Sequence, residues 1–394
     1  MFLILAVGIP FLTEGVLALV RYPIVPLIRA SNPPNYRIQR NNIEFSFKFS
    51  INKMGIRYPD IPLAKAPNEN RVLLLGDSFT EGMGVEYEQT FGALLEQKLS
   101  KEGKPVRFIN GGLTSAGPLE YAKLFYFVGI QYNPDVILII LYANDVTDTQ
   151  VLPDKVLKNR KLWLEGNPGE LAIKGFFHFV FPRCYTLVKA IREREKREEG
   201  IDLITLTRKH ARKKGIPDEK INAWISKIPT DLLEAANRNA FSAGLLTSGL
   251  IQPDIWVNNI DLEGEGVTEK WRTMIQILNT VIDLSREKKM NVGIVFAPNP
   301  MQYAKDYGNF QEGLGTLIKT EWADHETNIE RELQKWSETQ KAPFLNLTPY
   351  FRKLPEGEKK KMHYPLDGHW TPKGQQFVAD IIHDWLKKTK WVEH

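Results

Sequence analysis

Apolar runs alternate with amphipathic segments from residue 72 to the C-terminus. Runs rich in Val, Ile, Leu and Phe predict β-strands at residues 72–76, 106–110, 135–143, 291–298 and 342–350. Apolar residues at helical spacing predict helices over residues 89–103, 118–130, 271–289, 326–340 and 372–388. Nearly continuous apolar strands alternating with helices are typical of a parallel sheet that is covered on both faces. We therefore predict an α/β fold with a doubly wound, flavodoxin-like sheet of five parallel strands.

The sequence between the third and fourth predicted strands contains no strand of comparable quality. We interpret residues 150–267 as a mainly helical insertion, in which the alternating charges of residues 192–220 form a solvated face. The alternative interpretation of this charged part is a contact surface for an anionic partner. The predicted division of the chain is a transmembrane anchor (1–22), a linker and N-terminal extension (23–70), one α/β domain in two parts (71–149 and 268–394) and the insertion between them (150–267).

The N-terminal segment differs in kind from the rest of the chain. Residues 2–20 are apolar except for Thr13 and Glu14, and about 20 apolar residues suffice to cross a bilayer core of about 30 Å. We predict a single transmembrane helix here, with Glu14 as the residue that argues against it. A signal peptide and a buried core helix are the alternatives, but no basic n-region precedes the run and no small-residue cleavage site clearly follows it.

The orientation of this predicted anchor follows from the basic residues around it. Arginines follow the apolar run and none precede it, so the positive-inside rule, taken literally, places the remaining chain in the cytoplasm. Basic residues upstream of this sequence would reverse that assignment. We expect the main domain to be extracytoplasmic and held at the membrane through residues 2–20.

Composition narrows the chemistry further. The chain has 394 residues, 43% apolar and 25% charged, and a net charge of +5 does not by itself indicate a nucleic-acid partner. A single cysteine, Cys184, excludes an internal disulfide framework and a Cys-rich metal site. The glycine-rich residues 109–118 lack the spacing of a dinucleotide-binding loop. We expect neither a cofactor nor a metal ion.

Polar side chains follow the predicted strands where a parallel sheet gathers its active sites. Ser78 follows the first strand, Asn144 follows the third, and Asp367 and His369 precede the last helix. Each alone has a structural explanation, as a helix cap, a turn residue or a histidine whose hydrogen bonds are made within the fold. Together they supply a nucleophile, a base, an acid that orients the base, and an oxyanion donor. The set predicts nucleophilic catalysis by a serine.

Four blocks in this order resemble the SGNH or GDSL hydrolase family. They are GDSFTEG (76–82), INGGLTSAGP (109–118), YAND (142–145) and DGHWTPKG (367–374). FSINKMGIRYPD (49–60) is similar to the N-x-x-G-x-R stretch of membrane-anchored bacterial members. The resemblance implies that Ser78 is the nucleophile, His369 the general base and Asp367 the acid that orients it. The N–H groups of Ser78 and Ser115 and the side-chain amide of Asn144 are then the oxyanion donors.

Two departures from the family pattern concern the rim of this site. Ser115 stands where the family usually has a glycine donor, and a backbone N–H survives that change if the turn tolerates a Cβ atom. Tyr142 stands at the first glycine of G-x-N-D and narrows the site. We also assign Gly117 and Trp370 to substrate binding, and give Asp77 a structural rather than a chemical role.

The resemblance leaves three functions open. The first is a serine ester hydrolase that cleaves an acyl ester, for example an acetyl group on a carbohydrate or a lipid-like ester. The second is transfer of the same acyl group to a sugar hydroxyl, because D-x-H-W in residues 367–370 resembles the alginate-type polysaccharide O-acetyltransferases. The third is a membrane-tethered accessory or scaffold subunit that binds a protein partner through the insertion at residues 150–267.

Overall fold

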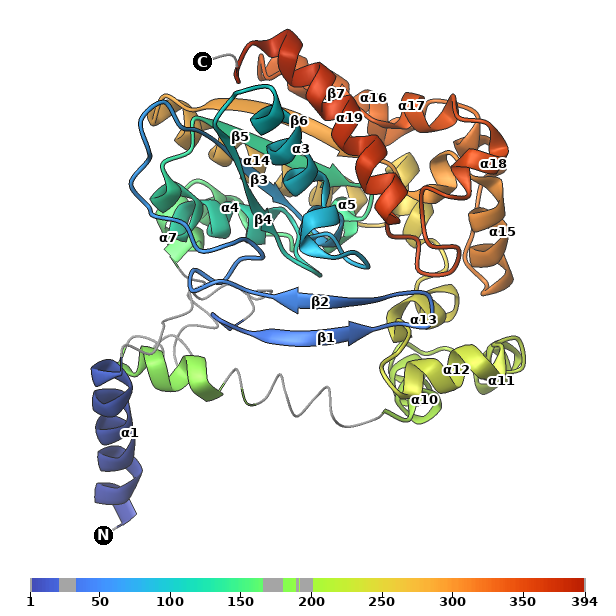
Figure 1. Cartoon of the computed structure of the whole chain (residues 1–394). Coiled ribbons are helices and arrows are strands. Elements are labelled where there is room, and N and C mark those ends of the chain that lie inside the picture. The colour runs from blue at the N-terminus through green and yellow to red at the C-terminus, as the bar shows by residue number, and fades with distance from the viewer. Residues whose placement is uncertain (1, 21–32, 166–179, 189–190, 192–200, 393–394) are drawn as a thin grey trace.

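The computed structural model describes residues 2–20, 33–165, 180–188, 191 and 201–392. Its centre is a five-stranded parallel sheet with the strand order β4-β3-β5-β6-β7 (Figure 1). The strands are β3 (Asn70–Gly76), β4 (Val106–Gly112), β5 (Val136–Tyr142), β6 (Asn291–Ala297) and β7 (Phe344–Asn346). This order is the flavodoxin-like one. The chain adds β4 on one side of β3 and then adds β5, β6 and β7 on the other side. The prediction of a doubly wound parallel sheet is confirmed.

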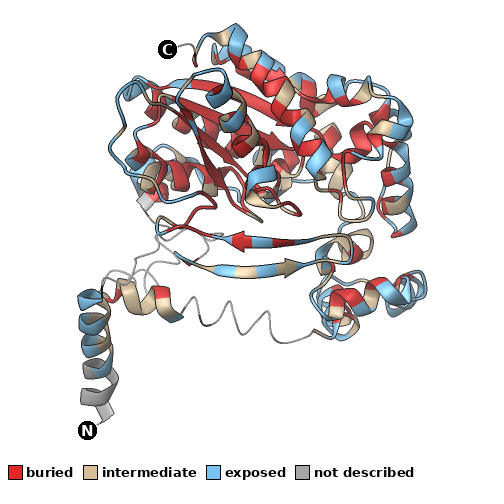
Figure 2. Ribbon diagram, in the orientation of Figure 1, coloured by how far each residue is buried: buried red, intermediate tan, exposed pale blue. Residues whose placement is uncertain are grey.

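Helices cover both faces of the sheet because its strands are apolar on both sides. Alternate β3 residues face opposite layers, so Leu73 packs with α4 (Pro118–Phe127) and α14 (Val267–Glu287), whereas Leu74 packs with α3 (Phe91–Lys101) and α19 (Pro372–Thr389). Figure 2 shows the buried residues concentrated in the sheet and on the inner faces of these helices. The layers hold the carboxyl ends of β3, β4 and β5 side by side.

Shorter helices fill the connections of the main domain. After β3 come α2 (Ser78–Glu81) and the 3₁₀ turn η1 (Tyr87–Gln89), and around β5 come η2 (Gly129–Tyr132) and α5 (Asp145–Asp148). After β6 come η4 (Pro300–Gln302), α15 (Lys305–Gly313), η5 (Thr320–Ala323) and α16 (Asn328–Thr339). After β7 come α17 (Thr348–Arg352) and α18 (Glu356–Lys359). The segment predicted as a strand over 342–350 is therefore a strand of three residues followed by a helical turn that begins at Thr348.

An antiparallel hairpin that the sequence analysis did not predict lies between the sheet domain and the insertion (Figure 1). Its strands are β1 (Arg37–Asn41) and β2 (Ser46–Ser50), paired from Arg37 with Ser50 to Asn41 with Ser46. In β2, the inward Phe47 and Phe49 alternate with exposed polar residues, which is the period of a half-buried strand. The region assigned to a linker and extension thus carries ordered structure.

The described part of the insertion consists of helices and connecting loops. Its helices include α6 (Asp154–Leu157), α7 (Arg160–Glu165), α10 (Leu203–Lys213), α11 (Asp218–Ile225), α12 (Thr230–Asn237), α13 (Ala243–Ile251), the π-helical turn η3 (Val257–Asp261) and a helix over residues 182–188. The helices α10 to α13 share a small core with Leu314, and within it Trp224 donates its indole N–H to the carbonyl of Leu246 at 3.1 Å.

The N-terminal helix α1 (Phe2–Leu19) has 18 residues and contains Pro10. The carboxylate of Glu14 accepts backbone N–H bonds from Arg183 at 3.0 Å and Cys184 at 2.9 Å. Among the residues that the structure describes, no helix combines the length and the apolar character needed to cross a membrane. The predicted transmembrane anchor at residues 1–22 is therefore not supported, and Glu14, the residue that argued against it, instead binds another segment of the protein.

Candidate active site

Ser78 lies at the turn between β3 and α2. The strand ends at Gly76, where a Cβ atom would collide with the side chain of Thr80 and approach the carbonyl oxygen of Ile140 to 2.9 Å. Asp77 then caps the short helix, because its carboxylate accepts the N–H of Phe79 at 2.9 Å. Ser78 is the first residue of that helix and is partly exposed, whereas its neighbours are buried. The turn therefore presents a hydroxyl at the carboxyl edge of the sheet.

Asp367 and His369 reach Ser78 from the loop before α19. The Nε2 atom of His369 lies 2.7 Å from the Oγ atom of Ser78, and its Nδ1 atom makes a short hydrogen bond to Asp367. Gly368 between them has φ of +86°, and a Cβ atom there would collide with the hydroxyl of Tyr307. A glycine is thus required for the turn that directs both side chains to one place. The structure brings together the three residues predicted as nucleophile, base and acid.

The environment of His369 favours its protonated form. Burial by itself lowers the pKa of this imidazole, but the charge of Asp367 and the hydrogen bond to it outweigh burial. Further negative charge comes from Asp77 and Glu81, and the net pKa is raised above 6.5. A base with a raised pKa binds the proton of a hydroxyl more strongly, and it loses its function at the pH where it becomes protonated.

The residues predicted to bind an oxyanion follow the two strands next to Ser78. Asn144 follows β5, and its side-chain amide donates to Asp148 Oδ2 at 2.8 Å. The Oδ1 atom of Asn144 is buried and has no hydrogen-bond partner in the described part of the chain. Ser115 follows β4, is exposed, and has φ of +62°, the left-handed conformation that glycine adopts most easily. The turn therefore accepts the Cβ atom of Ser115 at the cost of backbone strain.

Gly117, predicted to bind substrate, lies at the start of α4. A Cβ atom on Gly117 would stand 3.3 Å from the backbone oxygen of Asp148, so the turn after β4 packs closely against the helix that follows Asn144. Its own N–H is donated to the side chain of Glu120 at 3.2 Å. A contact between Gly117 and substrate stays a prediction.

Tyr142 and Trp370, the other residues predicted at the substrate, line the buried side of the site. Phe79 stacks on Tyr142 with ring centroids 4.1 Å apart and lies 4.7 Å from the ring of His369. Trp370 is fully buried and packs edge-on against Phe79 at 5.0 Å. The hydroxyl of Tyr142 accepts the amide of Asn299 at 2.7 Å. Tyr142 and Trp370 thus pack against Phe79, which in turn packs against the ring of His369. A contact of Tyr142 or Trp370 with substrate stays a prediction.

Two buried acids, Asp77 and Asp145, lie in the turns that follow β3 and β5. Asp77 is 2% exposed and its Oδ2 atom has no partner among the described residues, so burial raises the pKa of its carboxyl to about 7. Asp145 accepts the hydroxyl of Tyr121 at 2.7 Å and the N–H of Tyr142 at 2.9 Å. Burial, and then the charge of Asp77, raise the pKa of Asp145 as well. Asp145 anchors the turn that carries Asn144, which agrees with a structural role for these acids.

Arg57, the arginine of the N-x-x-G-x-R stretch, supports the nucleophile turn. It is 1% exposed and donates to the carbonyl oxygens of Glu81 at 3.0 Å, Gly82 at 2.6 Å and Val85 at 2.7 Å. These carbonyls belong to the end of α2 and the residues after it, where the helix leaves acceptors unsatisfied. The sequence motif was a usable signal for this contact, but only the structure shows what the arginine binds.

The buried Glu81 joins three parts of the site. Its carboxylate accepts a short hydrogen bond from Thr114, which precedes Ser115, and lies 3.5 Å from the guanidinium of Arg40 on β1. Glu81 belongs to the GDSFTEG block, yet its partners are far away in sequence. Sequence reasoning missed this network because nothing in the pattern connects residues 40, 81 and 114.

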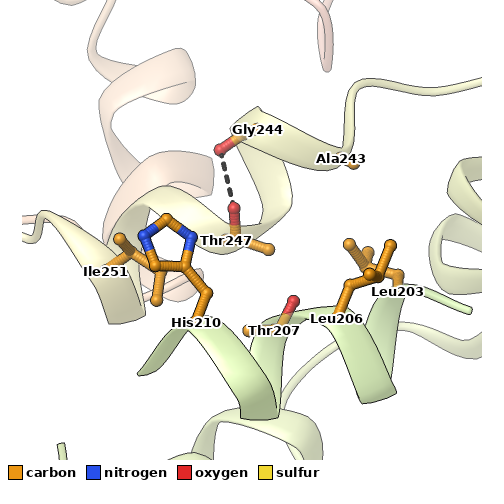
Figure 3. Close-up of a pocket in the computed structure, with 8 residues that line it drawn as sticks. All are labelled: Leu203, Leu206, Thr207, His210, Ala243, Gly244, Thr247 and Ile251. Carbon is orange, nitrogen blue, oxygen red and sulfur yellow. Dashed lines mark hydrogen bonds between the residues drawn. The ribbon is translucent and has the colours of Figure 1, made fainter. Parts of the chain in front are cut away.

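A cavity of about 160 Å³ lies elsewhere, between α10 and α13 (Figure 3). Leu203, Leu206 and Ile251 supply much of its apolar lining, with His210 at one side. None of its lining residues belongs to the sheet domain. Within the described residues, no group of three His, Cys, Asp or Glu side chains is arranged to hold a metal ion.

Comparisons with known proteins add the following. No protein-family model and no curated protein matches the chain. A lipolytic protein of the G-D-S-L family from Desulfitobacterium hafniense DCB-2 matches with 10% identity and a TM-score of 0.34, covering 80% of this chain and 98% of that chain. The esterase EstA from Pseudoalteromonas sp. matches with 14% identity and a TM-score of 0.37 (82% and 100% covered). The lipase/acylhydrolase from Enterococcus faecalis matches with 11% identity and a TM-score of 0.39 (81% and 96% covered).

The solved structures to which this chain is similar are therefore lipolytic enzymes and esterases.

Proposed function

We propose that this chain is a serine ester hydrolase of the SGNH or GDSL type, which cleaves an acyl ester through an acyl-enzyme. The observation that carries the proposal is the continuous hydrogen-bonded series Ser78–His369–Asp367, with Nε2 of His369 2.7 Å from Oγ of Ser78. Such a series is what a weak hydroxyl nucleophile needs for its activation. The family resemblance of the four sequence blocks supports the same assignment.

In the first half of the reaction, Oγ of Ser78 forms a bond to the ester carbonyl carbon. Nε2 of His369 takes the hydroxyl proton, and the carbonyl π electrons move onto oxygen as the tetrahedral oxyanion forms. Asp367 accepts the Nδ1–H of His369, which leaves Nε2 free to act as the base. The geometry of the strand ends supports the N–H groups of Ser78 and Ser115 as oxyanion donors. A side-chain amide has two N–H groups, and Asn144 donates one of them to Asp148, which leaves the second for the oxyanion.

In the second half, the tetrahedral species collapses and the bond to the alcohol oxygen breaks. The Nε2–H of His369 protonates the leaving alcohol, and the acyl group remains on Ser78. Water then attacks the acyl-enzyme, with His369 again removing the proton. When the second tetrahedral species collapses, the bond between the acyl carbon and Oγ of Ser78 breaks and the Nε2–H of His369 returns its proton to Oγ, which releases a carboxylic acid and the free Ser78 hydroxyl.

We propose that one hydrolase domain is assembled from residues 71–149 and 268–394, with residues 150–267 as an insertion. The first part supplies β3, β4 and β5 with Ser78, and the second part supplies β6, β7 and the loop with His369. The sheet joins the two parts through the pairing of β5 with β6. The insertion leaves the domain after α5, close to the proposed oxyanion donor Asn144.

Reaction with a fluorophosphonate tests the proposal directly, because the reagent reports an activated serine without knowledge of the natural substrate. The wild-type protein should be labelled on Ser78, and Ser78→Ala should abolish labelling. Hydrolysis of p-nitrophenyl esters should fall by about 10⁴-fold or more in that variant. Ser100→Ala, an exposed serine on α3, is the matched control and should change neither result. Unchanged hydrolysis in folded Ser78→Ala would refute the assignment.

The same ester-hydrolysis assay identifies the preferred acyl group and the molecule that accepts it. Rates across acetyl, butyryl and longer acyl esters measure the preferred acyl length. A sugar acceptor added at fixed ester concentration separates water from an alcohol as the acyl acceptor. Hydrolysis predicts the same consumption of ester with and without the sugar, whereas consumption that requires the sugar would contradict hydrolysis as the main reaction.

A further inference from the structure

The β1–β2 hairpin contacts the loop that carries Asp367, the carboxylate proposed to orient His369. We propose that two residues of the hairpin turn, Asn42 and Glu44, are positioning residues that hold Asp367 in line with His369. This inference rests on the proposed function, because it gives these residues an effect on the base of that reaction. Neither residue contacts Ser78, so their effect must pass through Asp367.

Glu44 binds the backbone of the acid loop at two successive residues. Its Oε2 atom accepts the N–H of Asp367 at 2.6 Å, and its Oε1 atom accepts the N–H of Leu366 at 2.9 Å. A carboxylate that accepts two adjacent N–H groups fixes both the position and the direction of that backbone segment. The backbone that carries the side chain of Asp367 is therefore fixed in position at the edge of the sheet.

Asn42 binds the side chain of the acid. Its Nδ2 atom donates to Asp367 Oδ2 at 3.4 Å, while the other oxygen, Oδ1, is the partner of His369. With one oxygen held by the asparagine and the other by the imidazole, rotation of the carboxylate about its χ2 bond is opposed from both sides. Asn42 also accepts the N–H of Glu44 at 3.1 Å, so the two turn residues hold one another.

The hairpin turn is itself fixed by neighbours on three sides. Toward the insertion, the N–H of Ile43 donates to the carbonyl of Ala240 at 3.0 Å. Toward the acid loop, Phe45 packs on Tyr364 with ring centroids 4.7 Å apart, and the hydroxyl of Tyr364 donates to the carbonyl of Gly84 at 2.8 Å. Toward the nucleophile helix, the hairpin strand β1 carries Arg40, the partner of Glu81. A turn held in this way can impose its geometry on Asp367.

The carboxylates of Glu44 and Asp367 lie close enough to repel each other. Burial and the charge of Asp367 raise the pKa of Glu44, against the two N–H bonds that lower it. A neutral oxygen acceptor in place of the Glu44 carboxylate would bind one N–H group without repulsion from Asp367. A carboxylate that bridges the N–H groups of Leu366 and Asp367 fits precise placement of this loop.

The test uses the full chain with Asn42→Ala and Glu44→Gln, each assayed by ester hydrolysis and by the rate of fluorophosphonate labelling. Displacement of a catalytic group by about 1 Å costs on the order of 100-fold, so we expect kcat to fall by about 10- to 100-fold with little change in KM. Gln39→Ala is the matched control. It removes an exposed hydrogen bond to Ser46 on the same hairpin, remote from Asp367, and should leave both rates unchanged.

The pH profile separates positioning from a general loss of structure. Asp367, Asp77 and Glu81 are the acids that raise the pKa of His369, so a displaced Asp367 should move the acid limb of kcat/KM to lower pH. Asn42→Ala removes no charge, and loss of its N–H bond to Asp367 would by itself raise the pKa of His369, so a shift of the limb to lower pH in that variant reports displacement of Asp367. Partial unfolding would lower the amplitude of the profile without moving the limb.

A double-mutant cycle with Asp367→Asn completes the test. If Asn42 acts through Asp367, then Asn42→Ala should cost little in the Asp367→Asn background. Full additivity, or an unmoved acid limb in folded Asn42→Ala, would overturn the positioning role. If Glu44→Gln does not fold, the folded Asn42→Ala decides. Absence of labelling in the wild-type protein would instead overturn the proposed function, so the two failures are distinguishable.

Discussion

Replacing Asp77 by asparagine should stabilise the folded protein most at neutral and alkaline pH. The carboxyl of Asp77 is buried beneath the nucleophile turn, and burial raises its pKa from 3.8 to about 7. Between those two pH values the folded protein keeps a proton that the unfolded chain has released. The free energy of unfolding therefore falls as the pH rises through this window, because the native state binds more protons.

The size of the effect follows from the difference between the two pKa values. Each pH unit inside the window lowers the free energy of unfolding by about 1.4 kcal/mol, so the total loss approaches about 4 kcal/mol above pH 7. Between pH 5 and pH 8 the loss is about 2 to 3 kcal/mol. Asparagine keeps the oxygen that accepts the N–H of Phe79 and carries no proton to lose. The variant should therefore lack this part of the pH dependence.

Urea unfolding at pH 5 and pH 8, followed by tryptophan fluorescence, measures the difference. The stability of Asp77→Asn relative to wild type should increase by about 2 to 3 kcal/mol between the two pH values. Asp283→Asn, an exposed residue on α14, is the control, and its difference from wild type should stay constant. A constant difference for Asp77→Asn, or a variant that is less stable than wild type at pH 8, would refute the reasoning.

Two further predictions concern the same turn and its support. Ser115→Gly should keep the rate of fluorophosphonate labelling within a few-fold of wild type, because the backbone N–H remains. It should change the free energy of unfolding by no more than about 1 kcal/mol, because the strain at φ of +62° is relieved. A loss of labelling of more than tenfold would assign a role to the Ser115 hydroxyl. Arg57→Lys should destabilise the protein by about 2 to 4 kcal/mol in urea unfolding, because an ammonium cannot serve the carbonyls of Glu81, Gly82 and Val85 together; a change below about 0.5 kcal/mol would contradict the role given to Arg57.

The sheet was predictable because its signal is local. The run around Leu73 and Leu74 is apolar on both faces, which is typical of a strand that is covered on both sides. Of the five predicted strands, the one over residues 342–350 was the least accurate. Phe344–Asn346 forms a strand, but Pro349 is favoured in the first turn of a helix and cannot donate to a strand ladder.

The site was predictable only in part. Ser78, Asp367 and His369 stand in recognisable blocks at the ends of predicted elements, so a sheet edge was enough to bring them together. The hairpin was missed because each strand has five residues, and the alternation of Phe47 and Phe49 with polar neighbours is too short to distinguish from chance. The contacts of Asn42 and Glu44 with Asp367 span more than 300 residues, and no spacing rule connects them.

The helical unit α10 to α13 contacts both the loop that carries Asp367 and the hairpin that binds this loop. Leu366, the residue before the proposed acid, packs against the small core of α10 to α13, and the turn residue Ile43 donates its N–H to Ala240 of the same unit. The acid loop is thus enclosed by the hairpin on one side and the helical insertion on the other. An insertion that only covered the surface would not need to contact both the loop and the hairpin that binds it. The two contacts argue that the insertion helps to hold Asp367 in place, through the same turn that carries Asn42 and Glu44.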